Sequence, residues 1–269
     1  MHYIVQENIF RETNYQLVMQ ALDRLKLPYS IVRIFPFVDK ITLLQDIPDD
    51  FNVDGLPDYN PPSTNVFVFG AVKLARIAQK KQWHPGSMLN DNHDFNVYKQ
   101  YYKENLLNYD SIIGTVSHAL SIHWHGNLFI RPTRDSKAFT GKLFTATEWR
   151  ELCILNEPTE IFNESTPIQI ASPKIIQKEI RLWIVDGKIV TGSQYKLGSL
   201  LLADGNYDPE AEVFAQKMID LFQPAKAFVM DVCLHENSWK IVEINCINAS
   251  GFYMADMQKL LISLERCWN

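Results

Sequence analysis

The chain has 269 residues, of which 46% are hydrophobic and 21% charged, a composition typical of a folded protein long enough for two subdomains around one cleft. A net charge of −5 argues against a general nucleic-acid binder and leaves room only for a local basic cleft. There is no apolar run near the roughly 20 residues of a membrane span, no signal-peptide pattern at the amino terminus, and no CxxC pair among the four cysteines, so we expect a cytoplasmic protein with reduced thiols and no membrane partner.

The first 120 residues predict an α/β lobe. A short apolar strand at residues 2–5, a helical apolar pattern at 11–27 and a β-branched strand at 29–35 give a βαβ-like opening, which predicts a parallel sheet. The other elements expected in this lobe are a loop at 46–64, a strand at 65–70, a helix at 72–81, a turn at Pro85 and Gly86, and an amphipathic helix at 95–108.

Strands dominate the sequence beyond residue 124. The dipeptide formed by Asp186 and Gly187 is typical of a two-residue type I′ hairpin turn. The expected elements are strands at 127–132, 141–145, 168–171 and 178–197, a helix at 210–222, strands at 226–236 and 239–245, and a terminal helix at 254–268.

Three polar side chains are expected to converge on the last hairpin. Because side chains alternate across a strand, Glu243 and Asn245 share one face, and Ile241 is expected on that face too. If residues 236–238 form the connecting loop, Asp231 lies opposite Glu243 on the neighbouring strand. Two carboxylates this close repel unless a cation lies between them, and Mg²⁺ suits such oxygen ligands and leaves positions for phosphate. The alternative is that these are exposed polar positions on a half-solvated sheet.

A basic loop and a buried arginine are the other candidate features. Residues 129–142 contain four cations among turn-forming residues, namely Arg131, Arg134, Lys137 and Lys142. Such a loop suits a polyphosphate, although many basic loops are simply solvated, and the chain has neither a P-loop motif nor GxGxxG. Glu179 and Arg181 share one strand face, and a buried arginine needs an anion. Its partner is either an intramolecular carboxylate or a bound phosphate or carboxylate.

Three weaker signals have ordinary explanations. His123 and His125 lack a third ligand at a supporting spacing, so we expect a structural role for them. Cys233 and Cys246 lack an evident His–acid arrangement, so neither is predicted to be a nucleophile. Residues 192–196 are expected to form a loop near the site, where they contact substrate or simply end a strand.

The ordered motifs FIRPTRDSKAFTGKLFT, EIRLWIVDGKIVTGSQY and FVMDVCLHENSWKIVEINCINASGFY resemble the ATP-grasp superfamily. They most closely resemble its clade of predicted ATP-dependent peptide ligases of phages and bacteria, over about residues 120–256. The upstream stretch at 66–86 is similar to the pre-ATP-grasp lobe of that clade. The resemblance implies an α+β ATP-grasp fold at 121–269, preceded by an α/β pre-ATP-grasp lobe at 1–120. Within the ATP-grasp domain it implies a small lid subdomain at 121–175 and a magnesium-binding subdomain at 176–269.

The resemblance also implies where ATP binds. Arg131 and Lys137 are expected at the phosphates, with Arg131 standing where many superfamily members have lysine. Residues 170–174 resemble the interlobe hinge, so Ser172, Pro173 and Lys174 are expected at the adenine. Glu179 is similar to an acid placed near the nucleotide.

The same resemblance implies the chemistry. Arg181 and Lys137 are the expected catalytic residues, with Arg181 as the clamp on the transferred group. The implied magnesium ligands are Asp231, Glu243 and Asn245. With ATP and Mg²⁺ as cofactors, such an enzyme joins a small-molecule or peptide carboxylate to an amine through an acylphosphate, and the loop at 133–142 excludes water as a lid.

Other functions remain alternatives. Some ATP-grasp relatives phosphorylate hydroxyl groups, and a nucleotide-binding regulatory module without turnover is a further alternative. A metal-dependent nuclease built on Asp231 and Glu243 is disfavoured by the acidic balance of the chain. The sequence leaves open the identities of the acid and the amine, and the oligomeric state.

Overall fold

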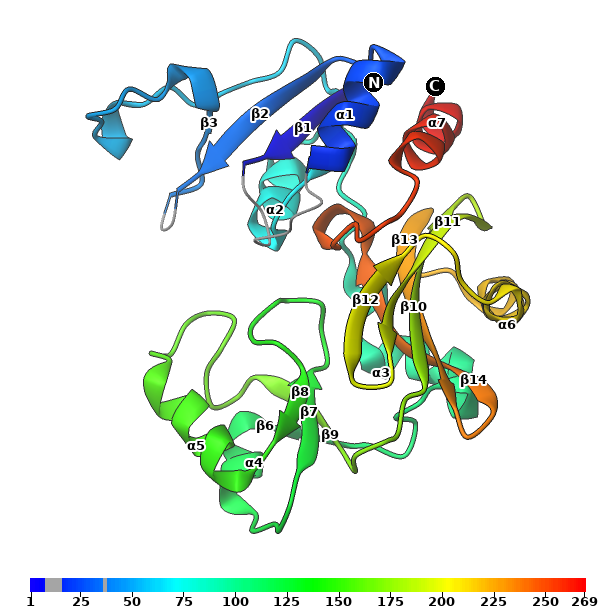
Figure 1. Ribbon diagram of the computed structural model, residues 1–269. Helices are drawn as coiled ribbons and strands as arrows, with labels where there is room; N and C mark the ends of the chain where they lie inside the picture. Colours follow the sequence, from blue (N-terminus) through cyan, green and yellow to red (C-terminus); the bar gives the residue numbers. More distant parts are fainter. Residues whose placement is uncertain (8–15, 36–37) are drawn as a thin grey trace.

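A computed structural model describes residues 1–7, 16–35 and 38–269. Its strands form three sheets, which confirms the predicted mixture of helices and strands (Figure 1). We call them the amino-terminal sheet, in the order β3-β2-β1-β4-β5, the small sheet, in the order β6-β9-β7-β8, and the large sheet, in the order β12-β11-β10-β13-β14.

The amino-terminal sheet is largely parallel, as the βαβ-like opening predicts. Its strands are β1 (His2–Gln6), β2 (Tyr29–Ile34), β3 (Ile41–Leu43), β4 (Asn65–Phe69) and β5 (His84–Gly86), and its helices are α1 (Gln16–Leu25) and α2 (Val72–Lys80). Strand β1 pairs in parallel with β2 and β4, whereas β3, which was not predicted, is antiparallel to β2. Residues 11–15 of the predicted first helix lie outside the described residues. The turn predicted at Pro85 and Gly86 is wrong, because both residues pair with β4 as part of β5.

The small sheet has its own core. Its strands are β6 (Ile112–Thr115), β7 (Leu128–Pro132), β8 (Lys142–Phe144) and β9 (Pro167–Ala171), and its helices are α4 (Val116–Ser121) and α5 (Ala146–Leu155). Phe144, Trp149 and Phe162 are buried together between these helices and the sheet. The sequence reading missed α5, although Thr145 and Glu148 form a capping box, which is a recognisable signal for the start of a helix.

The large sheet is antiparallel. Its strands are β10 (Lys178–Val185), β11 (Lys188–Leu197), β12 (Leu200–Asp204), β13 (Ala227–His235) and β14 (Ser238–Cys246), and α6 (Pro209–Leu221) and α3 (Phe95–Tyr102) pack on one face. Asp186 and Gly187 have φ angles of 51° and 73°, which confirms the predicted turn with two left-handed residues. The loop predicted at 192–196 is wrong, because these residues belong to β11.

The amino-terminal and large sheets share a core that is closed by α7 (Met257–Trp268). This helix lies beside α1, so the two ends of the chain come together in Figure 1. One buried cluster combines Phe69 of β4, Trp183 of β10 and Leu260 of α7. The division of the chain predicted at residues 120 and 175 stays a prediction.

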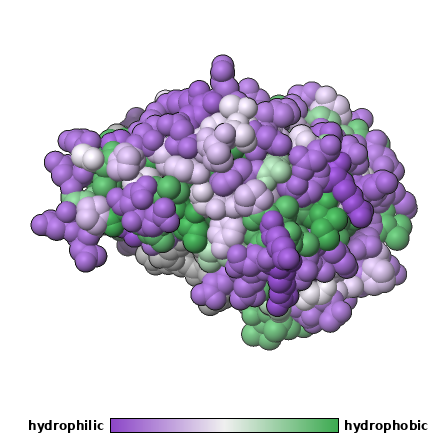
Figure 2. All heavy atoms as spheres, turned by 90° about the horizontal axis from the view of Figure 1, so that it is seen from above, coloured by the Kyte–Doolittle hydropathy of each residue, from purple (hydrophilic) through white to green (hydrophobic). Residues whose placement is uncertain are grey.

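Short 3₁₀ helices complete the fold, and one face of the surface is shown in Figure 2. The 3₁₀ helices are Leu44–Asp46, Val53–Gly55, Asp91–His93, Lys103–Asn105 and Ile247–Ala249. Seen from above the amino-terminal sheet, the surface is mainly hydrophilic with separate apolar patches (Figure 2). Within the described ranges, no helix has the length and apolar character needed to cross a membrane.

Candidate active site

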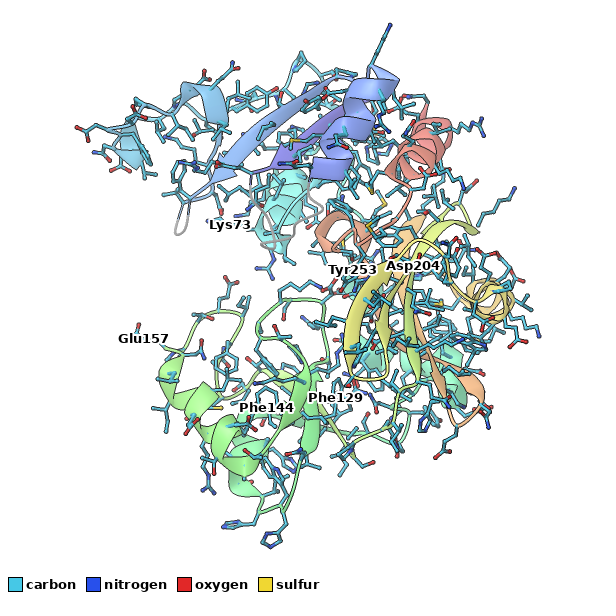
Figure 3. The ribbon with its side chains drawn as sticks, viewed as in Figure 1. Lys73, Phe129, Phe144, Glu157, Asp204 and Tyr253 are labelled. Atoms are coloured by element: carbon cyan, nitrogen blue, oxygen red, sulfur yellow. The ribbon has the colours of Figure 1, made fainter. Side chains whose placement is uncertain are left out.

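A cavity of about 640 Å³ lies between the small and large sheets. Phe129 of β7 lines one side and Tyr253, in the segment after β14, lines the other (Figure 3). The sequence-predicted residues that line it are Arg131, Lys137, Ser172, Lys174, Glu179, Arg181, Glu243 and Asn245. Most of the predicted site residues therefore lie around one space.

The pairing of β13 with β14 brings Asp231 and Glu243 together, but the register differs from the predicted one. His235 pairs with Ser238, so the connecting turn is one residue shorter than predicted. Asp231 nevertheless pairs with Glu243, because a β-bulge between Asp231 and Val232 restores the register. The prediction that Ile241 shares a face with Glu243 is wrong. Because of the bulge, Ile241 packs with Ile244 in the core, on the opposite face from Glu243.

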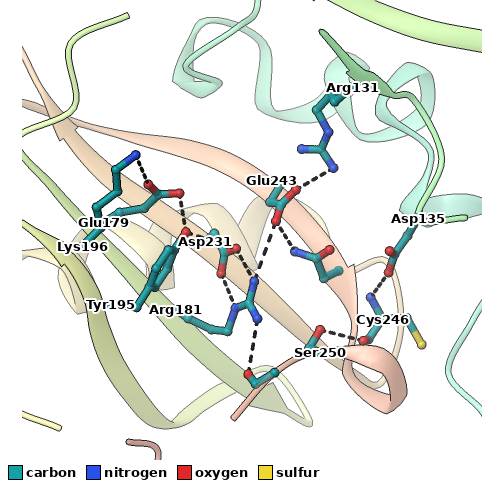
Figure 4. Close-up of polar contacts among 12 residues, drawn as sticks. Arg131, Asp135, Glu179, Arg181, Tyr195, Lys196, Asp231, Glu243, Cys246 and Ser250 are labelled. Carbon is teal, nitrogen blue, oxygen red and sulfur yellow. Dashed lines mark hydrogen bonds and ion pairs between the residues drawn. The ribbon is translucent and has the colours of Figure 1, made fainter. Parts of the chain in front are cut away.

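Arg181 and Asp231 form a buried, bidentate ion pair. The Nε and Nη2 atoms of Arg181 donate to the Oδ1 and Oδ2 atoms of Asp231 at 2.8 and 2.7 Å (Figure 4). Burial raises the pKa of Asp231 to about 7, although Arg181 acts in the opposite direction. Burial alone would lower the pKa of Arg181, but Asp231 keeps it well above its ordinary value. Of the two partners that the sequence left open for Arg181, the structure contains the intramolecular carboxylate.

Glu243 is held by a second arginine. Its Oε2 lies 2.6 Å from Nη2 of Arg131, and its Oε1 lies 3.8 Å from Nη2 of Arg181. Asn245 Nδ2 donates to Glu243 Oε1 at 2.8 Å. Burial would raise the pKa of Glu243, but Arg131, Lys137 and Arg181 together hold it well below its usual range. This carboxylate is therefore ionised at neutral pH, with cations on several sides.

Lys137 reaches the same site from the basic loop. Its Nζ donates to Asn245 Oδ1 at 3.1 Å and lies 2.6 Å from Asp135 Oδ1. The loop returns past β7 at Gly141, where an added Cβ would lie only 2.7 Å from Cβ of Arg131, so a larger residue would clash. The structure thus brings Arg131, Lys137 and Arg181 together around Asp231, Glu243 and Asn245.

Glu179 belongs to a buried cluster with two tyrosines. The Tyr195 hydroxyl donates to Glu179 Oε1 and also lies 3.5 Å from Asp231 Oδ2. Lys196 Nζ lies 3.6 Å from Glu179 Oε2, and burial is the main reason why the pKa of Glu179 is raised. The Tyr195 and Tyr253 rings stack with centroids 4.6 Å apart and planes 3° apart. The sequence reading named Tyr195 only within a loop and missed Tyr253, because their pairing joins segments far apart in the chain.

The predicted hinge residues are only partly at the cavity. Ser172 and Lys174 line it, whereas Pro173 is not among the lining residues. Lys174 Nζ pairs with Asp110 Oδ2 at 2.7 Å, which ties the segment after β9 to the segment before β6.

The weaker candidates either lie away from this cluster or are unreactive thiols. His123 and His125 are exposed, while Trp124 between them packs against the core of the small sheet. All four cysteines lie in the described part of the chain and are free thiols. Burial raises the pKa of Cys246 to about 12 and raises that of Cys233 as well, so neither is an activated nucleophile.

The donor chemistry of the predicted metal ligands suits Mg²⁺. Asp231, Glu243 and Asn245 offer carboxylate and amide oxygens, the ligands that this hard cation prefers. Glu243 lines the cavity and has lone pairs besides the one that faces Arg131, whereas Asp231 is 0% exposed and is not among the lining residues. Among the described residues no group of three or more His, Cys, Asp or Glu could hold a metal ion, so any such site would depend on Asn245 as well as the two carboxylates.

Comparison with known proteins identifies the fold. A family model for an ATP-grasp domain, numbered family 3 of its clade, matches residues 40–264. The D-alanine–D-alanine ligase from Coxiella burnetii is similar with a TM-score of 0.61 and 16% identity, covering 100% of this chain and 95% of that one. The ATP-grasp ligase PsnB complexed with a minimal precursor gives 0.54 and 11%, covering 100% and 99%. No curated protein sequence matches. The solved structures confirm the predicted ATP-grasp fold.

Proposed function

Because the chain belongs to a family of ATP-grasp domains, which is family 3 of its clade, we propose that it is an ATP-dependent carbon–nitrogen ligase. It joins a carboxylate to an amine through an acylphosphate. We place it with the predicted peptide ligases of phages and bacteria that its motifs resemble.

One observation carries this proposal: three cations surround two carboxylates and an amide beside one cavity, and all of these residues line it except Asp231, which is buried behind Arg181. Arg131 pairs with Glu243, Arg181 pairs with Asp231, and Lys137 donates to Asn245. Phosphoryl transfer requires positioning and charge neutralisation more than a protein nucleophile. The cluster supplies cations for phosphate oxygens and oxygen ligands for Mg²⁺, and the cysteines nearby are not activated.

The residues suggest how ATP lies in the cavity. We assign the phosphates to Arg131 and Lys137, and the adenine to the segment that contains Ser172 and Lys174. Pro173 is assigned to the adenine with them as part of the hinge, and Glu179 is assigned to the nucleotide side of the cavity. Asp231, Glu243 and Asn245 would hold Mg²⁺, which supplies neutralisation of the phosphate charge when bound.

The reaction proceeds in two steps. An oxygen of the substrate carboxylate bonds to the γ-phosphorus while the bond to the β–γ bridging oxygen breaks, which gives an acylphosphate and ADP. The amine nitrogen then bonds to the acyl carbon, inorganic phosphate leaves, and the nitrogen loses a proton to solvent. Arg181 stabilises the charge on the transferred group through the guanidinium N–H groups that do not donate to Asp231. The basic loop closes the cavity against water, which protects the acylphosphate.

The solved relatives suggest which substrates to test first. One PsnB structure contains a minimal precursor with Mg and ADP, and another relative is a D-alanine–D-alanine ligase. Peptides and amino acids are therefore the first candidates for the acid and the amine of this enzyme. We also propose that it acts in the cytoplasm.

The test is ADP release that requires both an acid and an amine. The purified protein is incubated with Mg²⁺, ATP and mixtures of amino acids and short peptides, with a coupled ADP assay and mass spectrometry of the products. We expect ADP to form together with a product whose mass equals acid plus amine minus water. Asp231→Asn and Glu243→Gln should abolish ADP formation while the protein still folds, and Asp231→Asn should melt at a lower temperature because it leaves the buried Arg181 without its carboxylate.

A matched control is Glu236→Gln, which removes an exposed acid from the turn of the same hairpin and should keep full activity. Unchanged ADP formation in both Asp231→Asn and Glu243→Gln would remove the metal-site assignment. ADP release that depends on an alcohol instead of an amine would indicate a phosphotransferase. ATP binding without turnover across the whole panel would indicate a regulatory module.

A further inference from the structure

We propose that Asp135 is a positioning residue that holds the Lys137 ammonium at the nucleotide phosphates. Its carboxylate ties the basic loop to the end of β14 and fixes the lysine side chain in the same contact. This inference rests on the proposed function, because it assigns Lys137 to ATP.

The contacts of Asp135 join the two walls of the cavity. Its side chain is only 3% exposed and lies 2.6 Å from Lys137 Nζ through Oδ1. Its Oδ2 accepts the backbone N–H of Cys246 at 2.7 Å (Figure 4). Cys246 directly follows Asn245, whose Oδ1 accepts from the same lysine at 3.1 Å. One buried carboxylate therefore binds a loop cation and the backbone beside a predicted metal ligand.

Lys137 depends on such a partner because little else restrains it. Its side chain is 42% exposed, so packing does not fix the flexible four-carbon stem. Its backbone has a φ of 55°, a left-handed conformation that persists only where surrounding contacts impose it. The ion pair with Asp135 and the bond to Asn245 supply those restraints.

The base of the loop is held by different contacts, which makes the role of Asp135 separable. The backbone N–H of Phe95 donates to Thr133 O at 2.8 Å, and Arg134 Nε donates to Asp94 Oδ2 at 3.0 Å. Both contacts join the loop to the start of α3, whereas Asp135 joins it to β14. Asp94 is thus a second aspartate paired with a cation of the same loop, away from Asn245.

A double-mutant cycle distinguishes positioning from a general structural role. If Asp135 acts through Lys137, its substitution has no further effect once Lys137 is absent. If it only stabilises the loop, the two effects add.

The measurement is the affinity for ATP in the presence of Mg²⁺ by calorimetry, on the whole chain, for Asp135→Asn, Lys137→Ala, the double variant and Asp94→Asn. We expect Asp135→Asn to weaken binding about tenfold, the size expected for loss of a hydrogen bond to a charged group. Lys137→Ala should weaken it at least as much, and the double variant should equal Lys137→Ala. Asp94→Asn, the matched control, should bind as wild type does.

Two results would overturn the inference: wild-type affinity in Asp135→Asn, or the same tenfold loss when Asp135→Asn is added to Lys137→Ala. If Asp135→Asn does not fold by thermal melting, Asp135→Ser replaces it in the cycle, because its small hydroxyl removes the charge beside Lys137 and fits in the same space. A wild-type protein that binds no ATP with Mg²⁺ would refute the proposed function, and this inference with it.

Discussion

Each carboxylate of the candidate site has its own arginine, and the two residues differ in how they ionise. Asp231 is deeply buried, and burial raises its pKa to about 7. Glu243 has Arg131, Lys137 and Arg181 nearby, and its pKa is held well below the usual range. The two carboxylates therefore differ in environment: Asp231 is fully buried against Arg181, whereas Glu243 is partly exposed and lines the cavity.

His93 offers a prediction about pH at the scale of one residue. It is 2% exposed, and within the described residues its Nε2 has no hydrogen-bond partner. Burial lowers its pKa below the ordinary value of 6.5, against a smaller opposite effect of Asp135. Between the two pKa values the unfolded chain binds more protons than the folded one, so stability is lost as the pH falls below about 6.5.

The phenylalanine in His93→Phe cannot carry a charge. When the pH falls from 7.5 to 5.5, the free energy of unfolding of this variant should therefore decrease less than that of wild type. The free energy of unfolding in urea at both pH values measures this difference. Asp231, with its raised pKa, works in the opposite direction in this range, but it is common to both proteins and cancels in the comparison. Parallel pH profiles for the two proteins would contradict the prediction.

The site residues differ in how far the sequence could reveal them. Strand alternation and an assumed hairpin register predicted that Asp231, Glu243 and Asn245 converge, and Asp231 pairs with Glu243 only because a bulge offsets the shorter turn. The contact of Asp135 with Cys246 and the stacking of Tyr195 on Tyr253 depend on how loops fold over distant strands. Local patterns carry no information about such contacts, so these partners could be found only in the structure.

At the scale of elements, the bulge in β14 decides which side chains reach the cavity. Regular alternation would place Ile241 and Glu243 on one face, and the sequence reading made that error. The extra residue, Val242, lines the cavity, while Ile241 and Ile244 both pack in the core. A bulge redirects side chains beside a site without breaking the hairpin, but it leaves no reliable sequence signal.

Deletion of Val242 should therefore preserve the fold and impair the site. Ile241 would still pair with Val232, and Glu243 would still pair with Asp231, each on its present face. The straightened strand would move the Glu243 carboxylate relative to Arg131, and a misplacement of about 1 Å can cost about 100-fold in rate. We expect cooperative melting close to wild type and about 100-fold slower ADP formation.

Val242→Ala keeps the bulge and removes only the side chain, so its ADP formation should exceed that of the deletion by at least about tenfold. A deletion variant with wild-type turnover would show that the bulge is not needed to aim Glu243. A deletion variant that fails to melt cooperatively would show instead that the bulge stabilises the hairpin.

At the scale of the whole molecule, two of the three sheets are joined by one core. Tyr3, Trp183 and Leu261, from β1, β10 and α7, belong to a single buried cluster. The buried Asn248, just after β14, donates through Nδ2 to Val68 O at 2.7 Å and accepts from Met88 N–H at 2.6 Å through Oδ1. Sequence periodicity predicted most of these strands and helices in chain order. Composition and periodicity do not show that α7 packs in the core of the amino-terminal sheet.

We therefore expect the amino-terminal and large sheets to unfold as one unit, and Leu261→Ala tests this. Leu261 is 0% exposed, whereas its neighbour Ile262 is 36% exposed and serves as the matched control. Leu261→Ala should lower the free energy of unfolding by about 2–5 kcal/mol, the usual cost of emptying a packed core position, and Ile262→Ala should cost much less. Native-state hydrogen exchange should then accelerate equally in β1 and β13, because α7 packs against α1, β10 and β11. Faster exchange confined to β1 would mean that the two sheets open separately, and that the shared core does not couple the lobe nearest the amino terminus to the strands that carry Asp231 and Glu243.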